Sequence, residues 1–170
     1  MHHVDLGLLV LRVVLGVTII LHGWNHIFGG GKLEGTARWF ESMGMKPGWF
    51  HARMASFTEL AAGALFALGL LTPFAAAGII GLMVVAGMTA HRKNGFFIFK
   101  PGQGWEYVLN LAVAAFAVGA IGAGEWSIDH AIDLDVDGWW GAIVAGVGGV
   151  VGGALFLAAF WRPAPEQAPA

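Results

Sequence analysis

Cysteine is absent from this 170-residue sequence, and charged residues are scarce, at 12% of the chain. Without a thiol, the chain can form neither a disulfide framework nor a thiol-based electron relay. The nine Lys and Arg residues form no dense basic run, and the formal net charge is −2. Nucleic-acid binding requires clustered cations that neutralise phosphates, so this class is excluded as well.

Hydrophobic residues, in contrast, make up 57% of the chain, and the mean hydropathy is +0.70. A surface facing water does not tolerate this excess, so much of it must face lipid. The apolar stretches are 6–28, 54–71, 74–90, 107–124 and 139–161. Each is close to the roughly 20 residues that cross a bilayer as a helix, and none alternates as barrel strands do.

These stretches predict an all-α integral membrane protein: a four-helix transmembrane bundle plus a fifth, C-terminal transmembrane helix. The first stretch is interpreted as a helix rather than a signal peptide, because no basic residue precedes it. Pro73 follows the second stretch almost at once and suits the first turn of the next helix, which predicts a tight antiparallel hairpin. Residues 1–161 are expected to form a single domain, and 162–170 a disordered cytoplasmic tail.

The basic residues predict how the bundle is oriented. With five spans, one side of the membrane receives Lys32, Arg38, Lys46, Arg53, Arg92, Lys93, Lys100 and Arg162, and the ninth cation, Arg12, lies inside a span. The positive-inside rule makes that side cytoplasmic, with the N-terminus outside and the C-terminus inside. The opposite side carries the acidic loop 125–138. The expected location is the bacterial cytoplasmic membrane.

Ionisable groups inside a membrane are costly and invite a partner or a function. Arg12, Gly16, Gly23 and His26 share one helical stripe of the first span, with His22 at its edge. The glycines allow another helix to approach closely. The other intramembrane polar residues are Glu59, His91, Glu106 and Asn110. The predicted topology places all of these ionisable or amide side chains except Arg12 in the cytoplasmic half of the bundle, where they predict a binding pocket.

In this pocket, Glu59, His22 and Glu106 are candidates for handling protons, and His26, His91, Asn110 and Arg12 are candidates for binding a ligand. A quinone head group fits such a set, because it needs hydrogen-bonding partners, a proton acceptor and an apolar slot. No metal site is predicted, since the histidine spacing is weakly specific. Binding of a haem by two histidines, one from the first span and one from the third, is conceivable, but no other feature of the sequence supports it. The alternative is structural: an Arg12–Glu59 ion pair, a snorkelling Arg12, or solvated side chains at the interface.

Two further segments carry patterns. Trp39, Phe40 and Met43 fall on one side of a short predicted helix, which either covers the polar cluster as a lid or connects two spans at the interface. In the last span, Gly141, Ala145, Gly149 and Gly153 form a ridge of small residues. The ridge favours close packing, either within the bundle or against a second copy in a homo-oligomer.

Several short sequence segments, in their order along the chain, resemble those of the DoxX family of small bacterial membrane proteins. They include Leu11-Arg12 with His22-Gly23, Gly29-Gly30-Gly31, Trp39-Phe40-Glu41-Ser42-Met43-Gly44, Glu59, Leu71-Thr72-Pro73, His91, Asn94-Gly95-Phe96-Phe97, Gly104-Trp105-Glu106-Tyr107 and Trp126-Ser127-Ile128-Asp129. The resemblance implies a four-helix bundle, linked to thiosulfate–quinone oxidoreductase subunits and to oxidative-stress complexes. The fifth span departs from that pattern.

The leading hypothesis is therefore a membrane subunit of a redox system that binds a quinone and acts with a partner oxidoreductase. Because the chain has no cysteine, electrons must come from that partner. A non-catalytic scaffold for partner proteins is the alternative, and a small transporter is a third possibility.

Overall fold

The structure, a computed structural model, describes residues 2–163. Residues 164–170, most of the predicted tail, lie outside the described residues. Within the described part the chain is helical and forms no sheet, as the sequence predicts. The helices are α1 (His2–Phe28), α2 (Lys32–Ser42), α3 (Gly48–Leu68), α4 (Thr72–Ala86), α5 (Glu106–Ile121), α6 (Ile128–Ala131), α7 (Gly138–Ala142) and α8 (Gly149–Phe160).

Two long helices are continued by π-helical turns. Gly87–His91 and then a 3₁₀ turn, Arg92–Asn94, extend α4, while Ile143–Gly148 joins α7 to α8. Isolated π-helical turns occur often at functional sites. Both of these turns border the cavity described below.

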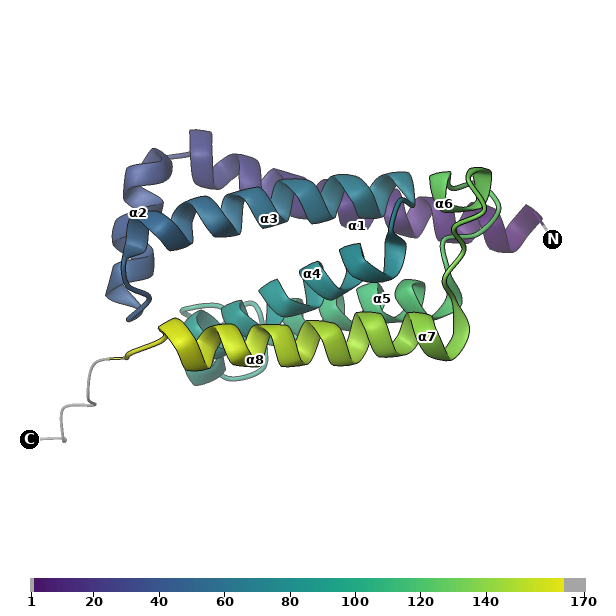
Figure 1. Cartoon of the computed structure of the whole chain (residues 1–170). Coiled ribbons are helices and arrows are strands. Elements are labelled where there is room, and N and C mark those ends of the chain that lie inside the picture. The colour runs from purple at the N-terminus through teal and green to yellow at the C-terminus, as the bar shows by residue number, and fades with distance from the viewer. Residues whose placement is uncertain (1, 164–170) are drawn as a thin grey trace, which may run out of the picture.

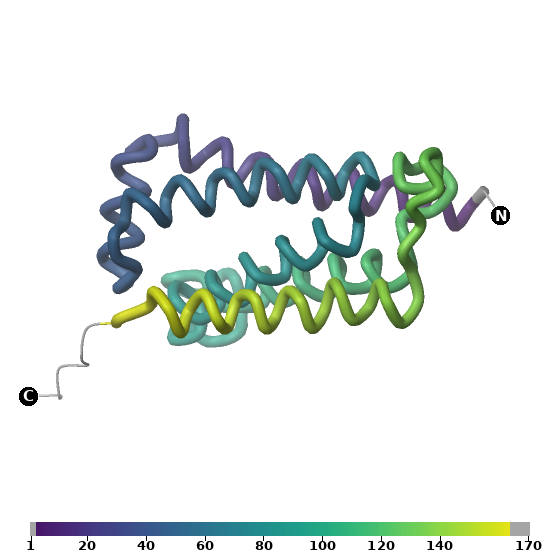
Figure 2. Tube along the Cα trace, viewed as in Figure 1, coloured from purple at the N-terminus to yellow at the C-terminus, as the bar shows by residue number. Residues whose placement is uncertain are grey.

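The long helices run lengthwise in two layers (Figures 1 and 2). The helices α1 and α3 form one layer, α4, α5 and the continuous α7–α8 helix form the other, and α2 runs across one end of the bundle. A three-residue turn joins α3 to α4, with Gly69 in the left-handed conformation at φ 64°. Pro73 lies in the first turn of α4, so the predicted tight hairpin is confirmed.

Hydrophobic side chains cover the outside of the bundle. Phe57 is 69% exposed, and Leu21, Val113 and Leu155 are exposed as well. Three helical stretches are long and apolar enough to cross a membrane: His3–Phe28, Thr72–Asn94 and Gly138–Phe160. An exterior of this kind is compatible with lipid and would be a liability in water.

The two remaining long helices differ from the predicted spans. α5 is apolar but has only 16 residues. α3 begins at Gly48 rather than at residue 54, and its first half carries His51 and Arg53, which lower its hydropathy. Hydropathy marks the residues that lipid tolerates, whereas the helix itself continues as far as its backbone hydrogen bonds allow. Whether α3 and α5 cross the membrane remains a prediction.

Glycines bring the helices of each layer together. A Cβ at Gly16 would lie 2.5 Å from the Gly63 carbonyl oxygen, and one at Gly23 would lie 3.0 Å from Cβ of Glu59. Since these distances leave no room for a side chain, α1 and α3 touch backbone to backbone, as the stripe of small residues predicts. The apolar core beside them includes Ile19, Phe66 and Val118.

The small-residue ridge of the last helix is also occupied within the chain. A Cβ at Gly149 would collide with Ile80, one at Gly153 would collide with Val84, and Ala145 is fully buried. The ridge therefore packs against α4 and α5, which is the intramolecular alternative. This packing replaces the predicted homo-oligomer contact through the ridge, because the surface that a second copy would need is already covered within the chain.

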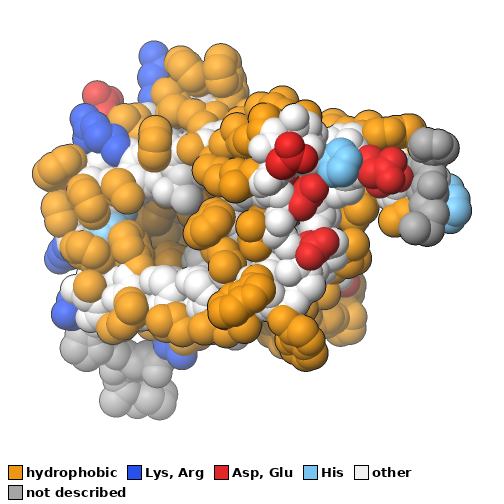
Figure 3. Space-filling model, turned by 45° about the vertical axis from the view of Figure 1, so that its right-hand side comes forward, with side chains coloured by type: hydrophobic (Ala, Val, Ile, Leu, Met, Phe, Trp, Pro, Cys, Tyr) orange, Lys and Arg blue, Asp and Glu red, His pale blue; other side chains and the backbone are white. Residues whose placement is uncertain are grey.

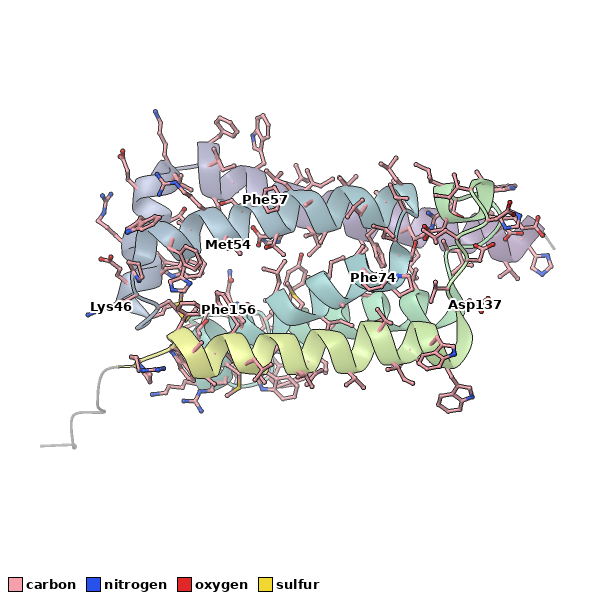
Figure 4. All side chains as sticks on the ribbon, in the orientation of Figure 1. Lys46, Met54, Phe57, Phe74, Asp137 and Phe156 are labelled. Atoms are coloured by element: carbon pink, nitrogen blue, oxygen red, sulfur yellow. The ribbon has the colours of Figure 1, made fainter. Side chains whose placement is uncertain are left out.

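Charge divides the molecule into two ends. Lys and Arg gather at the end that holds α2, and most Asp and Glu lie at the end that holds α6 (Figure 3). In Figure 4, Lys46 marks the basic end and Asp137 marks the acidic end. The predicted sorting of charges thus appears in the fold, and its assignment to the two sides of a membrane remains a prediction.

Candidate functional site

A cavity of about 730 Å³ lies between the two layers, towards the basic end. Met54 of α3 and Phe156 of α8 lie on facing sides of it (Figure 4). Figure 3 shows a hollow between the layers with mostly hydrophobic side chains at its edge. The volume and the apolar lining are typical of sites for small organic ligands, which need only a few polar groups for orientation.

The central polar group of the cavity is Glu59, which is 8% exposed. Its Oε2 lies 3.0 Å from Nδ1 of His26, which comes from the end of α1. The geometry of this contact does not form a good hydrogen bond, and neither atom has another partner within the described residues. Buried polar atoms are usually satisfied, so this pair has hydrogen-bonding capacity available for a ligand.

His22 and Tyr107 form a second polar contact in the lining. Nε2 of His22 and the Tyr107 hydroxyl lie 3.3 Å apart and join α1 to α5. Tyr107 is the only tyrosine of the chain. Sequence reasoning treated it only as the start of a span, although its position one residue after Glu106 places it in the first turn of α5.

His51 is the functional candidate that sequence reasoning missed. It is 1% exposed, it lines the cavity, and neither ring nitrogen has a hydrogen-bond partner in the described part of the chain. Its surroundings are aromatic, with ring centroids 5.2 to 5.4 Å from those of Phe50, Phe156 and Phe160. The available signal was its spacing: His51, Ala55 and Glu59 recur every four residues on one face of α3.

The structure brings four of the predicted site residues to this cavity: His22, His26, Glu59 and His91. His91 is held in place, because its Nδ1 donates to the Gln103 carbonyl oxygen at 2.9 Å. Trp39, Phe40 and Met43 also line the cavity, and the predicted short helix is confirmed as α2, which carries Trp39 and Phe40 and ends just before Met43. The cavity is therefore built from both layers.

The other three predicted residues lie elsewhere. Oε2 of Glu106 accepts a hydrogen bond from the backbone N–H of Ile98 at 3.1 Å, which fixes the loop before α5. The Asn110 amide donates to the Glu106 carbonyl oxygen, and neither side chain is among those lining the cavity. Arg12 is fully buried and its Nη2 donates to the Trp126 carbonyl oxygen at 2.6 Å, which places it towards the acidic end.

Arg12 belongs to a separate polar cluster with Asp129, whose charge attracts the guanidinium. The Asp129 carboxylate accepts hydrogen bonds from Leu71 N–H at 2.7 Å and from Thr72 N–H and Oγ1 at 2.9 and 2.7 Å. Gly69 packs against Nη1 of Arg12, so closely that a Cβ there would collide with it. This cluster joins α1, the α3–α4 turn and the loop that contains α6.

The chemistry available in the cavity is hydrogen bonding and proton transfer. Carboxylate, imidazole and phenol groups lie in one apolar space, and all three act as proton donors or acceptors. Among the residues that the structure describes, no three His, Asp or Glu side chains lie close enough together to hold a metal ion.

A helical bundle with a lipid-compatible exterior and a few ionisable groups inside defines an integral membrane protein. The DoxX family model matches residues 7–92, about half of the chain, and the chain belongs to the DoxX family. The match begins within α1 and runs through α4 and the π-helical turn that extends it. No curated protein and no solved structure gives a significant match.

Proposed function

We propose that this DoxX protein is a membrane subunit of a redox system that binds a quinone, or a similar cyclic head group, in the cavity between its layers. It acts with a partner oxidoreductase in the bacterial cytoplasmic membrane, with the basic end in the cytoplasm. The observation that carries the proposal is the unsatisfied His26–Glu59 pair inside a large apolar cavity.

The shape and lining of the cavity support a lipid-soluble ligand. Its wall between α3 and α8 is formed by Met54, Phe156 and Gly152. Met54 is 40% exposed on the side of the bundle, and in this proposal the ligand enters past it from the lipid phase. A quinone carries a polar ring on an apolar tail, which matches polar groups inside and an apolar rim.

The proposed roles of the residues follow from their positions. Glu59 and His22 handle protons, while His26 and His91 orient the head group, with Tyr107 beside His22 as a hydroxyl donor. His51 adds a hydrogen-bonding position, because both of its nitrogens are free for a ligand oxygen. In this proposal Arg12, Glu106 and Asn110 support the fold and do not touch the ligand.

The electrons must come from outside the chain. Reduction of a quinone to a quinol takes up two electrons and two protons, and this sequence has no cysteine to carry electrons. The partner therefore supplies the electrons by way of its own cofactor. This chain holds the acceptor and supplies protons to its ring oxygens.

Filling the cavity tests the proposal. Gly152 lines the cavity and a Cβ there meets nothing within 4 Å, so Gly152→Leu adds a side chain to the lining at a position where its first carbon has room. Quinone binding, measured by quenching of tryptophan fluorescence, should weaken about tenfold or more. Gly7→Leu is the matched control, because Gly7 also has open space around it and lies outside the cavity. Unchanged quinone affinity in Gly152→Leu would contradict the proposal.

Neutralising the carboxylate tests its chemical role. Glu59→Gln keeps the size of the side chain but removes the proton-transferring group. Quinone reduction by the complex should fall about 100-fold. If reduction continues at the normal rate, Glu59 does not handle the protons.

A further inference from the structure

A second pocket lies beside the first, at the corner where α1 turns into α2. It has a volume of about 430 Å³. Its lining is formed by the glycine turn 29–31 and by Asn25, His26, Gly35, Thr36 and Trp39. Most of this lining is backbone, amide and hydroxyl, whereas the main cavity is mostly apolar. A polar pocket of this size at the basic end is suited to water.

His26 belongs to the walls of both pockets. Its Nδ1 faces Glu59 in the main cavity and is buried. The side chain as a whole is 17% exposed, against 10% for Glu59. The imidazole therefore lies between the polar pocket and the carboxylate, with Nδ1 on the side of Glu59.

The backbone around His26 holds the ring in this position. The Thr36 hydroxyl donates to the His26 carbonyl oxygen at 3.0 Å, which ties the end of α1 to α2. Trp39 and Phe40 pack against the ring, with centroids 6.3 Å away in both cases. Among the described residues that line the polar pocket, His26 is the only ionisable one.

We propose that the polar pocket is a proton-entry vestibule, and that His26 passes protons from its water to Glu59. A proton from vestibule water binds Nε2 and makes the ring an imidazolium. The Nδ1 proton then moves to Oε2 of Glu59, which leaves a neutral imidazole and a neutral carboxylic acid. One proton enters, one proton moves on, and no electron is transferred.

The 3.0 Å contact is short enough for this transfer, which takes place when rotation of the imidazole aligns Nδ1–H with Oε2 of Glu59. Delivery of the proton onward to a quinone oxygen rests on the proposed function. The vestibule and its link to Glu59 do not depend on the ligand.

Engineered cysteines test the vestibule. Because the chain has no native cysteine, Gly35→Cys, Gly152→Cys and Gly7→Cys each create a single thiol at a site where a Cβ has room. A charged, membrane-impermeant maleimide applied to vesicles should label Gly35→Cys only from the side of the basic end. Gly152→Cys, in the apolar cavity, should react much more slowly. Equal labelling of these two thiols would overturn the vestibule.

The relay is tested without any ligand. The infrared band of the Glu59 carboxyl group is identified as the one lost in Glu59→Gln. After a rapid change of pH on the basic side, this band should respond about tenfold more slowly in His26→Gln than in the unchanged protein. Attachment of a bulky maleimide to Gly35→Cys should slow it as well, which covers the case in which His26→Gln does not fold. A response of normal speed in both proteins would overturn the relay.

The same proteins separate this inference from the proposed function. Gly35 lines the vestibule and not the main cavity, so in Gly35→Cys blocked with the maleimide quinone affinity should change little while the proton response slows. If no quinone binds to the unchanged protein but the infrared and labelling results hold, the proposed ligand is wrong and the proton route stands. If quinone binds and the infrared response is normal in His26→Gln, the route is wrong and the proposed function stands.

Discussion

Two polar clusters lie inside this bundle, and they are built in opposite ways. At the acidic end, the Asp129 carboxylate accepts three hydrogen bonds and the guanidinium of Arg12 is attracted by its charge. Gly69 brings the backbone into contact with Arg12 and leaves no space. Towards the basic end, Glu59, His26 and His51 have atoms without a hydrogen-bond partner among residues 2–163, and they border a cavity of about 730 Å³.

The difference separates structural from functional burial of polar groups. A satisfied, close-packed cluster stabilises the fold and gives a ligand neither space nor free hydrogen-bonding atoms. An unsatisfied cluster beside a cavity lowers stability. A protein that retains such a cluster offers a ligand both space and free hydrogen-bonding atoms. Within the described residues Arg12 has no hydrogen bond at Nε or Nη1, but the nearby charge of Asp129 and the close contact with Gly69 place it in the first group.

The largest expected effect comes from breaking the acidic-end cluster. Asp129→Ala removes an acceptor of three hydrogen bonds and leaves Arg12 buried without its counter-charge. The free energy of unfolding should fall by about 3 to 5 kcal/mol, measured as thermal unfolding in detergent. Asp129→Asn should lose less, because it keeps one acceptor oxygen.

Glu125→Ala is the control for this prediction. Glu125 is an exposed acid in the same loop, so its removal should leave stability nearly unchanged. A loss of stability in Glu125→Ala as large as that in Asp129→Ala would contradict the idea that the buried contacts, rather than the acidity of the loop, stabilise this end.

A smaller effect of opposite sign is expected in the cavity. His51→Leu removes two buried nitrogens that lack partners and places an apolar side chain among phenylalanine rings. Stability should rise by about 1 kcal/mol while quinone affinity falls. His91→Leu is the comparison: it should lower stability, because it removes the bond to the Gln103 carbonyl oxygen. Lower stability in both variants would show that His51 is a structural residue.

The smallest effect concerns His130, which is exposed at the acidic end. Its hydrogen bond to Asp135, at 2.8 Å, and the negative charges of Asp135, Glu125 and Asp133 raise its pKa above 6.5. Because the folded pKa is raised, the contribution to stability is fully present below pH 6.5 and is lost as the pH rises through the folded value. Melting temperatures measured from about pH 5 to about pH 8 should show this slight fall.

Two variants check the assignment of that pH dependence. His130→Ala and Asp135→Asn each remove one side of the pair, so both should flatten the dependence by a similar amount. If only one of them changes the profile, another group is responsible.

Local patterns of the sequence predict much of the fold. Apolar runs predict helices, Pro73 predicts the tight turn, and the glycines of α1 predict close packing against α3. Of the cavity residues, His22, His26, Glu59 and His91 were found because an ionisable group within an apolar run stands out.

The remaining site residues depend on information that such patterns do not contain. His51 precedes the apolar run of α3, and a hydropathy boundary at residue 54 places it outside the span. Asp129 is one of several acids in a loop. Its burial depends on backbone groups at Leu71 and Thr72, which lie 58 and 57 residues away in the sequence. Only the three-dimensional arrangement brings these partners together.

An isolated β-bridge at the end of the last helix also bears on how a ligand would exchange under the proposed function. Met45 pairs with Trp161, the Arg162 N–H donates to the Gly44 carbonyl oxygen at 2.9 Å, and the Trp161 indole donates to the Met43 carbonyl oxygen. The two layers are thus fastened at the basic end by this bridge and at the acidic end by Asp129. A hinge that opened either end would first have to break one of these fastenings. Under the proposed function, a ligand would therefore exchange through rotation of side chains between α3 and α8, with both ends of the bundle remaining closed.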